Sequence, residues 1–155
     1  MGRAFRRATP ADDETLGEVM YDAVRNGRSH YSEKQRAAWV PEPRKGAAWS
    51  ERLAKQDIVI AEEAGEVLGF MSLERDTAYL DFAYIRPKAQ GTGLFRQMLE
   101  RILERGRAQG MEQISVHASL MAQPAFAACG FAVTAEEEVT IADESFRRFA
   151  MTCTL

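Results

Sequence analysis

The chain of 155 residues is long enough for one domain with its own buried core. Its 46% hydrophobic and 28% charged residues are ordinary for a globular protein. A formal net charge of -3, with basic residues scattered along the chain, argues against a nucleic-acid partner. No apolar run approaches the ~20 residues that span a bilayer, and the N-terminus lacks the apolar stretch of a signal peptide. We therefore expect a cytoplasmic protein that does not associate with membranes.

The N-terminal third predicts one strand followed by helices. Residues 3–8 are typical of a short strand. Thr9 as N-cap, Pro10 at the first helical position and acidic residues in the first turn predict a helix, which Gly27 ends. Two weaker helical patterns follow, at residues 32–39 and 46–55.

The rest of the chain alternates strands and helices. The stretch DIVIAEEAGEVLGFMSLERDTAYLDFAYIRP predicts three consecutive strands, with turns near Ala64-Gly65 and Asp76-Thr77. An amphipathic helix is predicted next, at residues 92–108. The remaining predicted elements are a strand at 112–117, a short helix in LMAQPAFAACG, and strands at about 131–141 and 145–154.

This order of elements predicts a mixed α/β fold in which about four α-helices flank a twisted central sheet of about seven strands. Residues 79–117 form a strand-helix-strand unit, so the strands at 79–86 and 112–117 should run parallel. No internal repeat or low-complexity segment appears. We expect a single domain over residues 1–155.

The segment IRPKAQGTGLFRQMLERIL, residues 85–103, places two glycines directly before a helix. Backbone amides at a helix start are unpaired and form the positive end of the helix dipole, and glycines let an anion approach them. No Gly-Lys-Ser/Thr follows, as a Walker A loop requires, and Arg96 stands where a dinucleotide fingerprint needs glycine. The turn therefore predicts a pyrophosphate cradle of another kind.

These residues resemble the GNAT superfamily of N-acetyltransferases, which use acetyl-CoA. The family signature Q/R-x-x-G-x-G/A stands here as QGTGLF at residues 90–95, after Ile85-Arg86-Pro87. A second family motif, a short helix followed by Gly-Phe, resembles SLMAQPAFAACGF at residues 119–131. The segment HYSEKQRAAW is similar to a recurring piece of one bacterial branch of small members.

The resemblance implies where acetyl-CoA binds. Amides of the glycine turn would hold the CoA pyrophosphate, and the strand before the turn would pair through its backbone with the pantetheine arm. The strands at 79–86 and 112–117 would splay apart to leave a cleft for the thioester. Ser119 would contact the cofactor, although a helix N-cap explains that residue equally well. The implied cofactor-binding residues are Ala83, Tyr84, Ile85, Gln90, Gly91, Thr92, Gly93, Leu94, Phe95, Ser119 and Phe126.

Two residues depart from the family pattern. Phe95 occupies the last signature position, usually Gly or Ala, and helical spacing favours a core-facing ring beside Leu99 and Leu103. A ring that faced the pyrophosphate instead would weaken cofactor binding. Phe126 stands where many members have a tyrosine that protonates the departing thiolate. A phenyl ring lacks that proton, so Tyr84 or Tyr79 would have to replace it.

Acetyl transfer to an amine also needs a base that takes the amine's proton, or a group that anchors the amine. Asp81 is the best candidate, because a carboxylate in an apolar strand is costly unless it is hydrogen-bonded or lines a cleft. Strict strand alternation predicts Leu80, Phe82 and Tyr84 on one face, with Asp81 on the other. An Asp that merely pairs with a neighbouring Arg or Tyr is the alternative.

Three further residues are candidates for binding the acceptor. His117 would face the cleft beside Asp81, with a solvated strand-end histidine as the alternative. His30 and Tyr31 precede a helix where this fold builds its acceptor pocket, yet a capping box of Ser32 and Gln35 explains the same segment. The acidic run at 136–138 is typical of a solvated edge, with attraction of a cationic amine as the alternative.

We therefore predict an acetyl-CoA-dependent N-acetyltransferase that moves an acetyl group to a primary amine by direct attack in a ternary complex. The acceptor is a small molecule or a peptide amine, and members of the family often form homodimers through their C-terminal strands. The two histidines and two cysteines stand at no ligand spacing, so we expect no metal. The alternatives are a catalytically inactive CoA-binding regulatory module, which Phe95 and Phe126 favour, and a nucleotide-phosphate binder.

Overall fold

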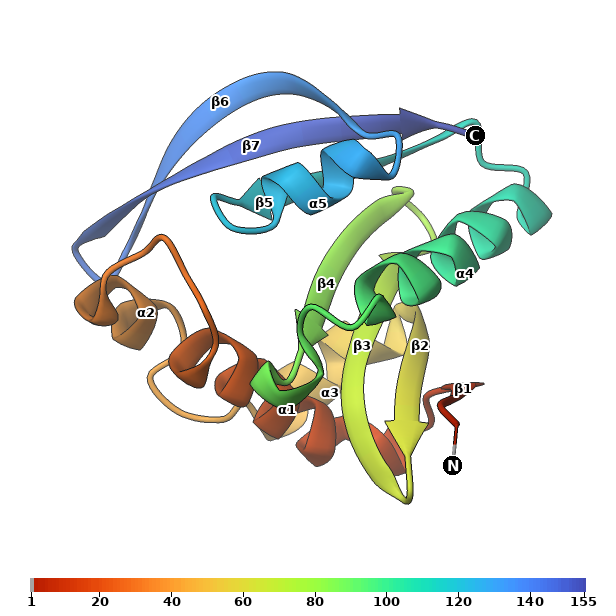
Figure 1. Ribbon diagram of the computed structural model, residues 1–155, viewed down its shortest axis with the longest axis horizontal. Helices are drawn as coiled ribbons and strands as arrows, with labels where there is room; N and C mark the ends of the chain where they lie inside the picture. The colour runs from red at the N-terminus through yellow and green to blue at the C-terminus, as the bar shows by residue number, and fades with distance from the viewer. Residues whose placement is uncertain (1) are drawn as a thin grey trace.

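The computed structural model describes residues 2–155, which form one seven-stranded sheet with helices on both of its faces (Figure 1). The strands are β1 (Ala4–Arg7), β2 (Gln56–Glu63), β3 (Glu66–Glu74), β4 (Tyr79–Ile85), β5 (Gln113–Ser119), β6 (Ala132–Ile141) and β7 (Glu144–Thr154). The α-helices are α1 (Asp13–Asn26), α2 (Glu33–Trp39), α3 (Ala47–Ala54), α4 (Leu94–Ala108) and α5 (Gln123–Ala128). Two short 3-10 helices, η1 (Pro10–Asp12) and η2 (Pro87–Ala89), precede α1 and the glycine turn.

The sheet has the strand order β1-β2-β3-β4-β5-β7-β6, and β4 and β5 are its parallel pair. All other neighbouring strands are antiparallel. The predicted mixed α/β fold and the parallel strand-helix-strand unit are therefore confirmed. The predicted helix at 92–108 begins two residues later, at Leu94, because Gly93 has a left-handed backbone with φ of 85°.

Two apolar cores lie on opposite faces of the sheet. One core joins the sheet to α4 and α5, through residues such as Met98, Leu99 and Phe126. The other joins the sheet to α1 and α3, through residues such as Leu16 and Trp49. Among the described residues, no helix is long and apolar enough to cross a membrane.

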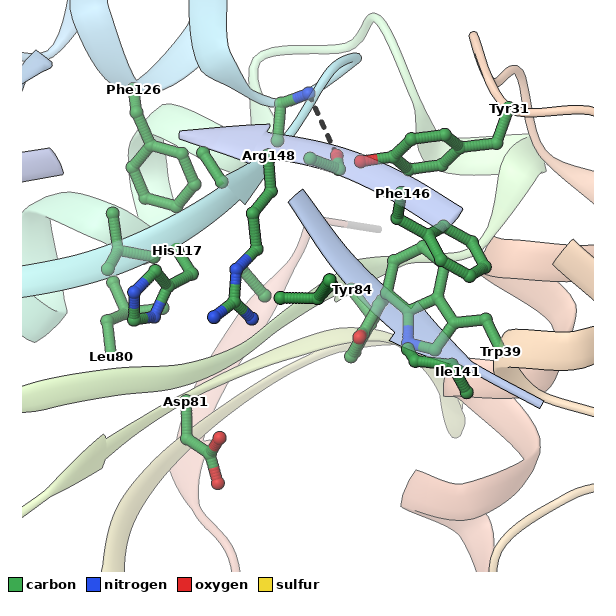
Figure 2. Close-up of a pocket in the computed structure, with 16 residues that line it drawn as sticks. Tyr31, Trp39, Leu80, Asp81, Tyr84, His117, Phe126, Ile141, Phe146 and Arg148 are labelled. Atoms are coloured by element: carbon green, nitrogen blue, oxygen red, sulfur yellow. Dashed lines mark hydrogen bonds between the residues drawn. The ribbon is translucent and has the colours of Figure 1, made fainter. Parts of the chain in front are cut away.

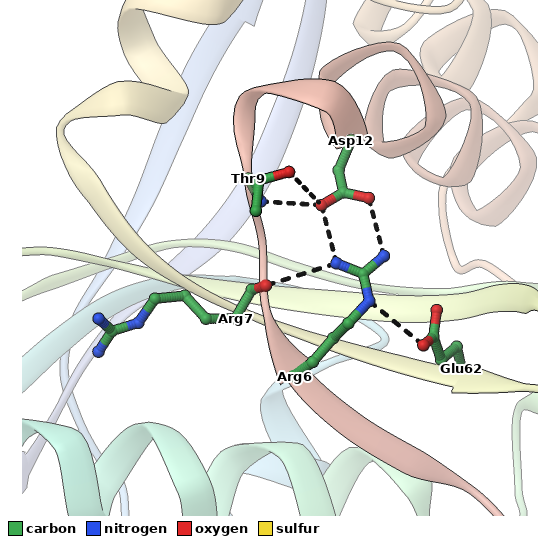
Figure 3. Close-up of polar contacts among 5 residues, drawn as sticks. All are labelled: Arg6, Arg7, Thr9, Asp12 and Glu62. Carbon is green, nitrogen blue, oxygen red and sulfur yellow. Dashed lines mark hydrogen bonds and ion pairs between the residues drawn. The ribbon is translucent and has the colours of Figure 1, made fainter.

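An ion cluster fastens the start of α1 to the edge of the sheet (Figure 3). Arg6 on β1 donates two hydrogen bonds to the Asp12 carboxylate, at 2.9 and 2.8 Å, and its Nε lies 3.2 Å from Glu62 on β2. Asp12 also accepts a hydrogen bond from the Thr9 amide at 2.8 Å. The hydrogen bonds from Arg6 lower the pKa of Asp12. These contacts hold the segment before α1 against the edge of the sheet.

A β-bulge at Asp81 interrupts the alternation of β4. Ser72 on β3 pairs with Phe82, and the next residue, Leu73, pairs with Leu80, so Asp81 has no partner residue in the ladder. The buried Ser72 hydroxyl accepts a hydrogen bond from the Phe82 amide at 3.0 Å and satisfies that backbone group. The prediction that Leu80 and Phe82 share a face is therefore wrong, since they belong to the two different cores.

β4 and β5 separate soon after they begin. Their pairing covers Tyr79 with Ser115 and Leu80 with Val116, and the ladder ends there. From Asp81 onward, the edge of β4 that faces β5 has no strand partner among the described residues. In Figure 1 the two strands diverge, with β5 held against β7 and β4 held against β3. The divergence leaves the end of β4 that precedes the glycine turn without a neighbouring strand on the β5 side.

Candidate active site

The glycine turn has the shape of an anion cradle. Gly91 and Gly93 have φ angles of 73° and 85°, which strain any residue with a side chain. A Cβ placed at either glycine would meet no atom within 4 Å, so the space in front of the turn is open. The amides that follow, from Leu94, start the 15-residue helix α4. A pyrophosphate fits such a turn, because unpaired amides and the helix dipole favour negative charge.

Two side chains of the turn itself and one from the N-terminal segment hold this turn in place. Gln90 Nε2 donates to the Ile85 carbonyl at 3.0 Å, and the Thr92 hydroxyl donates to the Ala89 carbonyl. Arg3, just before β1, donates to the Thr92 carbonyl at 3.3 Å and to Gln97 Oε1 at 2.9 Å. No local sequence pattern indicates this role for Arg3, because it lies 89 positions from Thr92.

Two cavities adjoin the free edge of β4. The larger has a volume of about 370 Å³ and reaches the glycine turn, with Gln90, Gly91, Gly93 and Phe95 in its wall. The smaller has a volume of about 140 Å³ and lies between β4, β5 and the β6–β7 hairpin (Figure 2). Six residues line both cavities: Tyr31, Trp39, Ala83, Tyr84, Ser119 and Ala122. The cavities therefore share one wall, at the site where the strands diverge.

Four polar residues, Asp81, Tyr84, His117 and Arg148, surround the smaller cavity (Figure 2). They come from β4, β5 and β7, and the structure thereby brings together the predicted Asp81, Tyr84 and His117. Arg148 was not predicted. Its position on β7 brings it next to Ser119 of β5, a neighbour that only the pairing of distant strands creates.

Asp81 is held by two side chains on the α3 side of the sheet. Arg52 on α3 donates to both carboxylate oxygens, at 2.8 and 2.7 Å, and Gln56 Nε2 donates to Oδ2 at 2.7 Å. The Asp81 side chain is 8% exposed, and its hydrogen bonds raise the pKa of Arg52. A carboxylate accepts about four hydrogen bonds, so the three from Arg52 and Gln56 leave Asp81 about one acceptor position.

His117 lies between two partners. Its Nδ1 is 2.7 Å from the Tyr79 hydroxyl, and its Nε2 is 3.3 Å from Glu137 on β6. His117 therefore shares a hydrogen bond with Tyr79 through Nδ1, while its Nε2 lies at ion-pair distance from Glu137. Burial raises the pKa of Tyr79, and the charge of Asp81 adds to the effect, so this hydroxyl keeps its proton at neutral pH.

Tyr84 lines both cavities at the point where they meet. Its ring packs among Trp39, Phe70 and Phe82, with centroid distances of 5.9 to 6.2 Å. Burial raises the pKa of Tyr84 far above its ordinary value. This hydroxyl therefore carries its proton throughout the neutral range and is available as a donor.

Tyr31 and His30 have different positions although they are adjacent in sequence. Tyr31 is buried in the wall of both cavities, where its hydroxyl donates to the Arg147 carbonyl and accepts from the Leu120 amide. It thus ties the segment before α2 to β7 and to the end of β5. His30 is exposed and lines neither cavity. The predicted capping box of Ser32 and Gln35 is confirmed.

The two phenylalanines that depart from the family pattern pack against each other. The rings of Phe95 and Phe126 meet edge to face at 5.0 Å, and Phe126 also contacts Phe131 at 5.1 Å. Phe95 packs against the core that contains Leu99 and Leu103, as the helical spacing predicted. Ser119 lines both cavities, and its hydroxyl accepts from the Ala122 amide at 3.2 Å.

A model of the acetyltransferase (GNAT) domain matches residues 28–155. The chain therefore belongs to the GNAT family of acetyltransferases, and the resemblance predicted from the glycine turn is confirmed. The uncharacterized N-acetyltransferase YafP of Escherichia coli K12 is 28% identical over 150 residues, which cover 95% of this chain and 93% of YafP. An L-methionine sulfoximine/L-methionine sulfone acetyltransferase of Pseudomonas aeruginosa is 32% identical over 124 residues, 72% of this chain and 67% of that protein.

Solved structures share the whole fold. A GCN5-related N-acetyltransferase from Rhodopseudomonas palustris is 26% identical with a TM-score of 0.88, covering 100% of this chain and 97% of that one. A Thermoplasma acidophilum N-acetyltransferase solved with coenzyme A has a TM-score of 0.76 at 17% identity, covering 100% of both chains. A Salmonella typhimurium protein solved with acetyl-CoA has a TM-score of 0.71 at 20% identity, covering 100% of this chain and 95% of that one.

Proposed function

We propose that this enzyme transfers an acetyl group from acetyl-CoA, its cosubstrate, to a primary amine by direct attack in a ternary complex. The observation that supports this proposal is the pair of cavities that meet at the free edge of β4. One cavity begins at an anion cradle, and the other is walled by polar and aromatic side chains. Two reactants that enter from opposite sides would meet beside Ala83 and Tyr84.

The cosubstrate side uses mostly backbone groups. The amides from Gly91 to Phe95 would hold the pyrophosphate, since the two glycines leave open space in front of them, while the Gln90 amide donates to the Pro87 carbonyl. The free edge of β4 at Ala83 to Ile85 would pair with the pantetheine arm, as an added strand does. The thioester supplies an activated acetyl group and a thiolate leaving group, while free N–H groups of β4 would stabilise the oxyanion that develops.

We assign the proton donor for the departing thiolate to Tyr84. Phe126 has no proton to give, and its ring packs against Phe95 and Phe131 in the core. Tyr84 lies where the cavities meet and keeps its proton because burial raises its pKa. No described residue forms a hydrogen bond with the Tyr84 hydroxyl, so it is free to donate to the thiolate.

On the acceptor side, we assign Asp81 the anchoring of the amine. Its remaining acceptor position would bind the ammonium form, and its fixed charge would favour entry of a cation. The Nδ1 of His117 is engaged with Tyr79, and its Nε2 lies 3.3 Å from Glu137. We therefore assign the uptake of the amine's proton to water in the open cavity, before the amine attacks.

Ligand-induced thermal stabilisation tests the cosubstrate first. Acetyl-CoA, CoA, ATP and NADH are compared side by side, and a ligand at ~100 times its dissociation constant should add ~2.7 kcal/mol of stability. We expect shifts with acetyl-CoA and CoA alone. Release of the CoA thiol is then followed with a panel of primary amines that includes L-methionine sulfoximine. Stabilisation by CoA without turnover of any amine would support the inactive regulatory module, and stabilisation by ATP alone would support a nucleotide binder.

A further inference from the structure

Arg148 gives the smaller cavity a positive charge that the acetyl-transfer chemistry does not use. We propose that the acceptor carries a carboxylate close to its amine, as an α-amino acid does, and that Arg148 binds this carboxylate. The inference rests on the proposed function, because it names the substrate class of the same site.

The guanidinium of Arg148 is presented end-on to the cavity. Its Nε donates to Glu137 Oε1 at 3.1 Å, which fixes the side chain against β6. No described residue accepts a hydrogen bond from its two terminal nitrogens, and the side chain is only 33% exposed. Figure 2 shows these two nitrogens extending into the cavity between His117 and Tyr84. Two parallel N–H donors in this arrangement match the two oxygens of a carboxylate.

The neighbours of Arg148 leave part of its charge uncompensated. Glu137 is its acidic partner, and the same oxygen, Oε1, also lies 3.3 Å from His117 Nε2. One carboxylate therefore serves two groups. The charge of Arg148 reaches across the cavity, since it lowers the pKa of Tyr31 and of Tyr79 against the larger upward effect of burial. A bound carboxylate would provide the acceptor that the two terminal nitrogens of Arg148 lack.

The opposite charge lies on the other side of the same cavity. Asp81 on β4 has a spare acceptor position, and Arg148 on β7 has two spare donors. In Figure 2 the Arg148 guanidinium extends into the cavity, whereas the Asp81 carboxylate points away from it, and Arg52 and Gln56 hold that carboxylate. A carboxylate beside the amine would accept hydrogen bonds from the two terminal nitrogens of Arg148, whereas a simple alkylamine would leave those nitrogens without an acceptor. Buried donors without an acceptor are costly, and this cost gives the selectivity.

Most of the other residues around the smaller cavity are apolar, and they indicate which side chain the acceptor carries. Its apolar walls are formed by Trp39, Leu80, Val116, Ala118, Val139, Ile141 and Phe146. Its volume of about 140 Å³ suits a compact molecule. An amino acid with an apolar side chain therefore fits better than one with a second charge, which would find no partner in these walls.

The test uses matched acceptors that differ in the carboxylate. The twenty common amino acids are screened for binding by thermal stabilisation in the presence of CoA. L-leucine is compared with L-leucinamide and 3-methylbutylamine, which keep the amine and the apolar chain. We expect the wild-type protein to bind at least one apolar amino acid roughly 10–100-fold more tightly than its amide, as charged hydrogen bonds allow. Arg148→Gln should remove that preference and leave CoA binding unchanged.

Arg147→Gln is the matched control. Arg147 is the next residue on β7, but its side chain is 61% exposed, pairs with Glu136 and lines neither cavity. This variant should keep the preference for the carboxylate. Equal binding of acid and amide by the wild-type protein, a preference that survives in Arg148→Gln, or no binding of any amino acid would each overturn the inference. Because binding is measured without turnover, a failure of acetyl transfer would count against the proposed function alone.

Discussion

Arg52 on α3 contacts both carboxylate oxygens of Asp81 at the bulge in β4, with Nε and Nη2 at 2.8 and 2.7 Å. The Arg52 guanidinium also lies 4.6 Å from the ring centroid of Phe82, the residue after the bulge. Helix α3 is thus tied to the point where β4 leaves β5. This bidentate contact fixes the orientation of the Asp81 carboxylate on the α3 side of the sheet.

Asp81→Asn should lower kcat by at least tenfold at unchanged affinity for acetyl-CoA, because the amine loses its anchor while the glycine turn is untouched. The free energy of unfolding should fall by about 1–2 kcal/mol, since charged hydrogen bonds to Arg52 are lost. Steady-state kinetics and denaturant unfolding measure the two effects. Arg52→Met distinguishes an Asp81 that anchors the amine from an Asp81 that takes the amine's proton. Loss of kcat in Arg52→Met comparable to that in Asp81→Asn fits a positioned anchor, whereas a rise in kcat would show that Asp81 acts as a free base.

Gly93→Arg should abolish binding of acetyl-CoA, because its side chain would fill the open space in front of the turn. Gly65→Arg is the control, since Gly65 has a similar φ of 81°, open surroundings and a place in the distant β2–β3 turn. Both variants should lose about 1–2 kcal/mol of stability through left-handed strain. Thermal shifts with CoA should separate them. A folded Gly93→Arg protein that still binds CoA would remove the pyrophosphate assignment.

Tyr84→Phe should lower kcat by about 10²-fold, a usual contribution of a general acid. Its stability should change by less than about 0.5 kcal/mol, since no described residue bonds to the hydroxyl. Tyr21→Phe on α1 controls for loss of a tyrosine hydroxyl outside the cavities. Burial raises the pKa of Tyr84, so kcat of the wild-type enzyme should show no alkaline decline below about pH 10. An unchanged kcat in Tyr84→Phe would exclude this residue as the acid.

Asp12→Asn should remove an acid-sensitive part of the stability. The pKa of Asp12 is lower in the folded protein than in the unfolded chain, because Arg6 donates hydrogen bonds to the carboxylate. The resulting stability is present above about pH 4 and is lost as the pH falls through the folded-state pKa. The variant should be up to about 1 kcal/mol less stable at pH 7 and should lose less stability on acidification. Asp76→Asn, in an exposed turn, should follow the wild-type curve.

Local sequence patterns were sufficient for the elements and for the glycine turn. The strand, the two glycines and the amphipathic helix lie within residues 79–108, and the shape of the turn depends on backbone conformations that glycine readily adopts. The parallel pairing of β4 and β5 followed from the helix between them. The core-facing position of Phe95 followed from helical spacing.

The smaller cavity and its charged residues depend on contacts between residues far apart in the chain. Arg52 lies 29 positions from Asp81, and the pairing of β5 with β7 brings Arg148 beside Ser119. The bulge at Asp81 was also not predicted, because side-chain alternation assumes an unbroken ladder. The buried Ser72 hydroxyl stabilises the break in this ladder. The sequence by itself determined the family fold and the anion cradle, since short-range backbone preferences encode both. The tertiary structure alone decided which charged side chains line the smaller cavity, because charge pairing is set by distance in space and by burial.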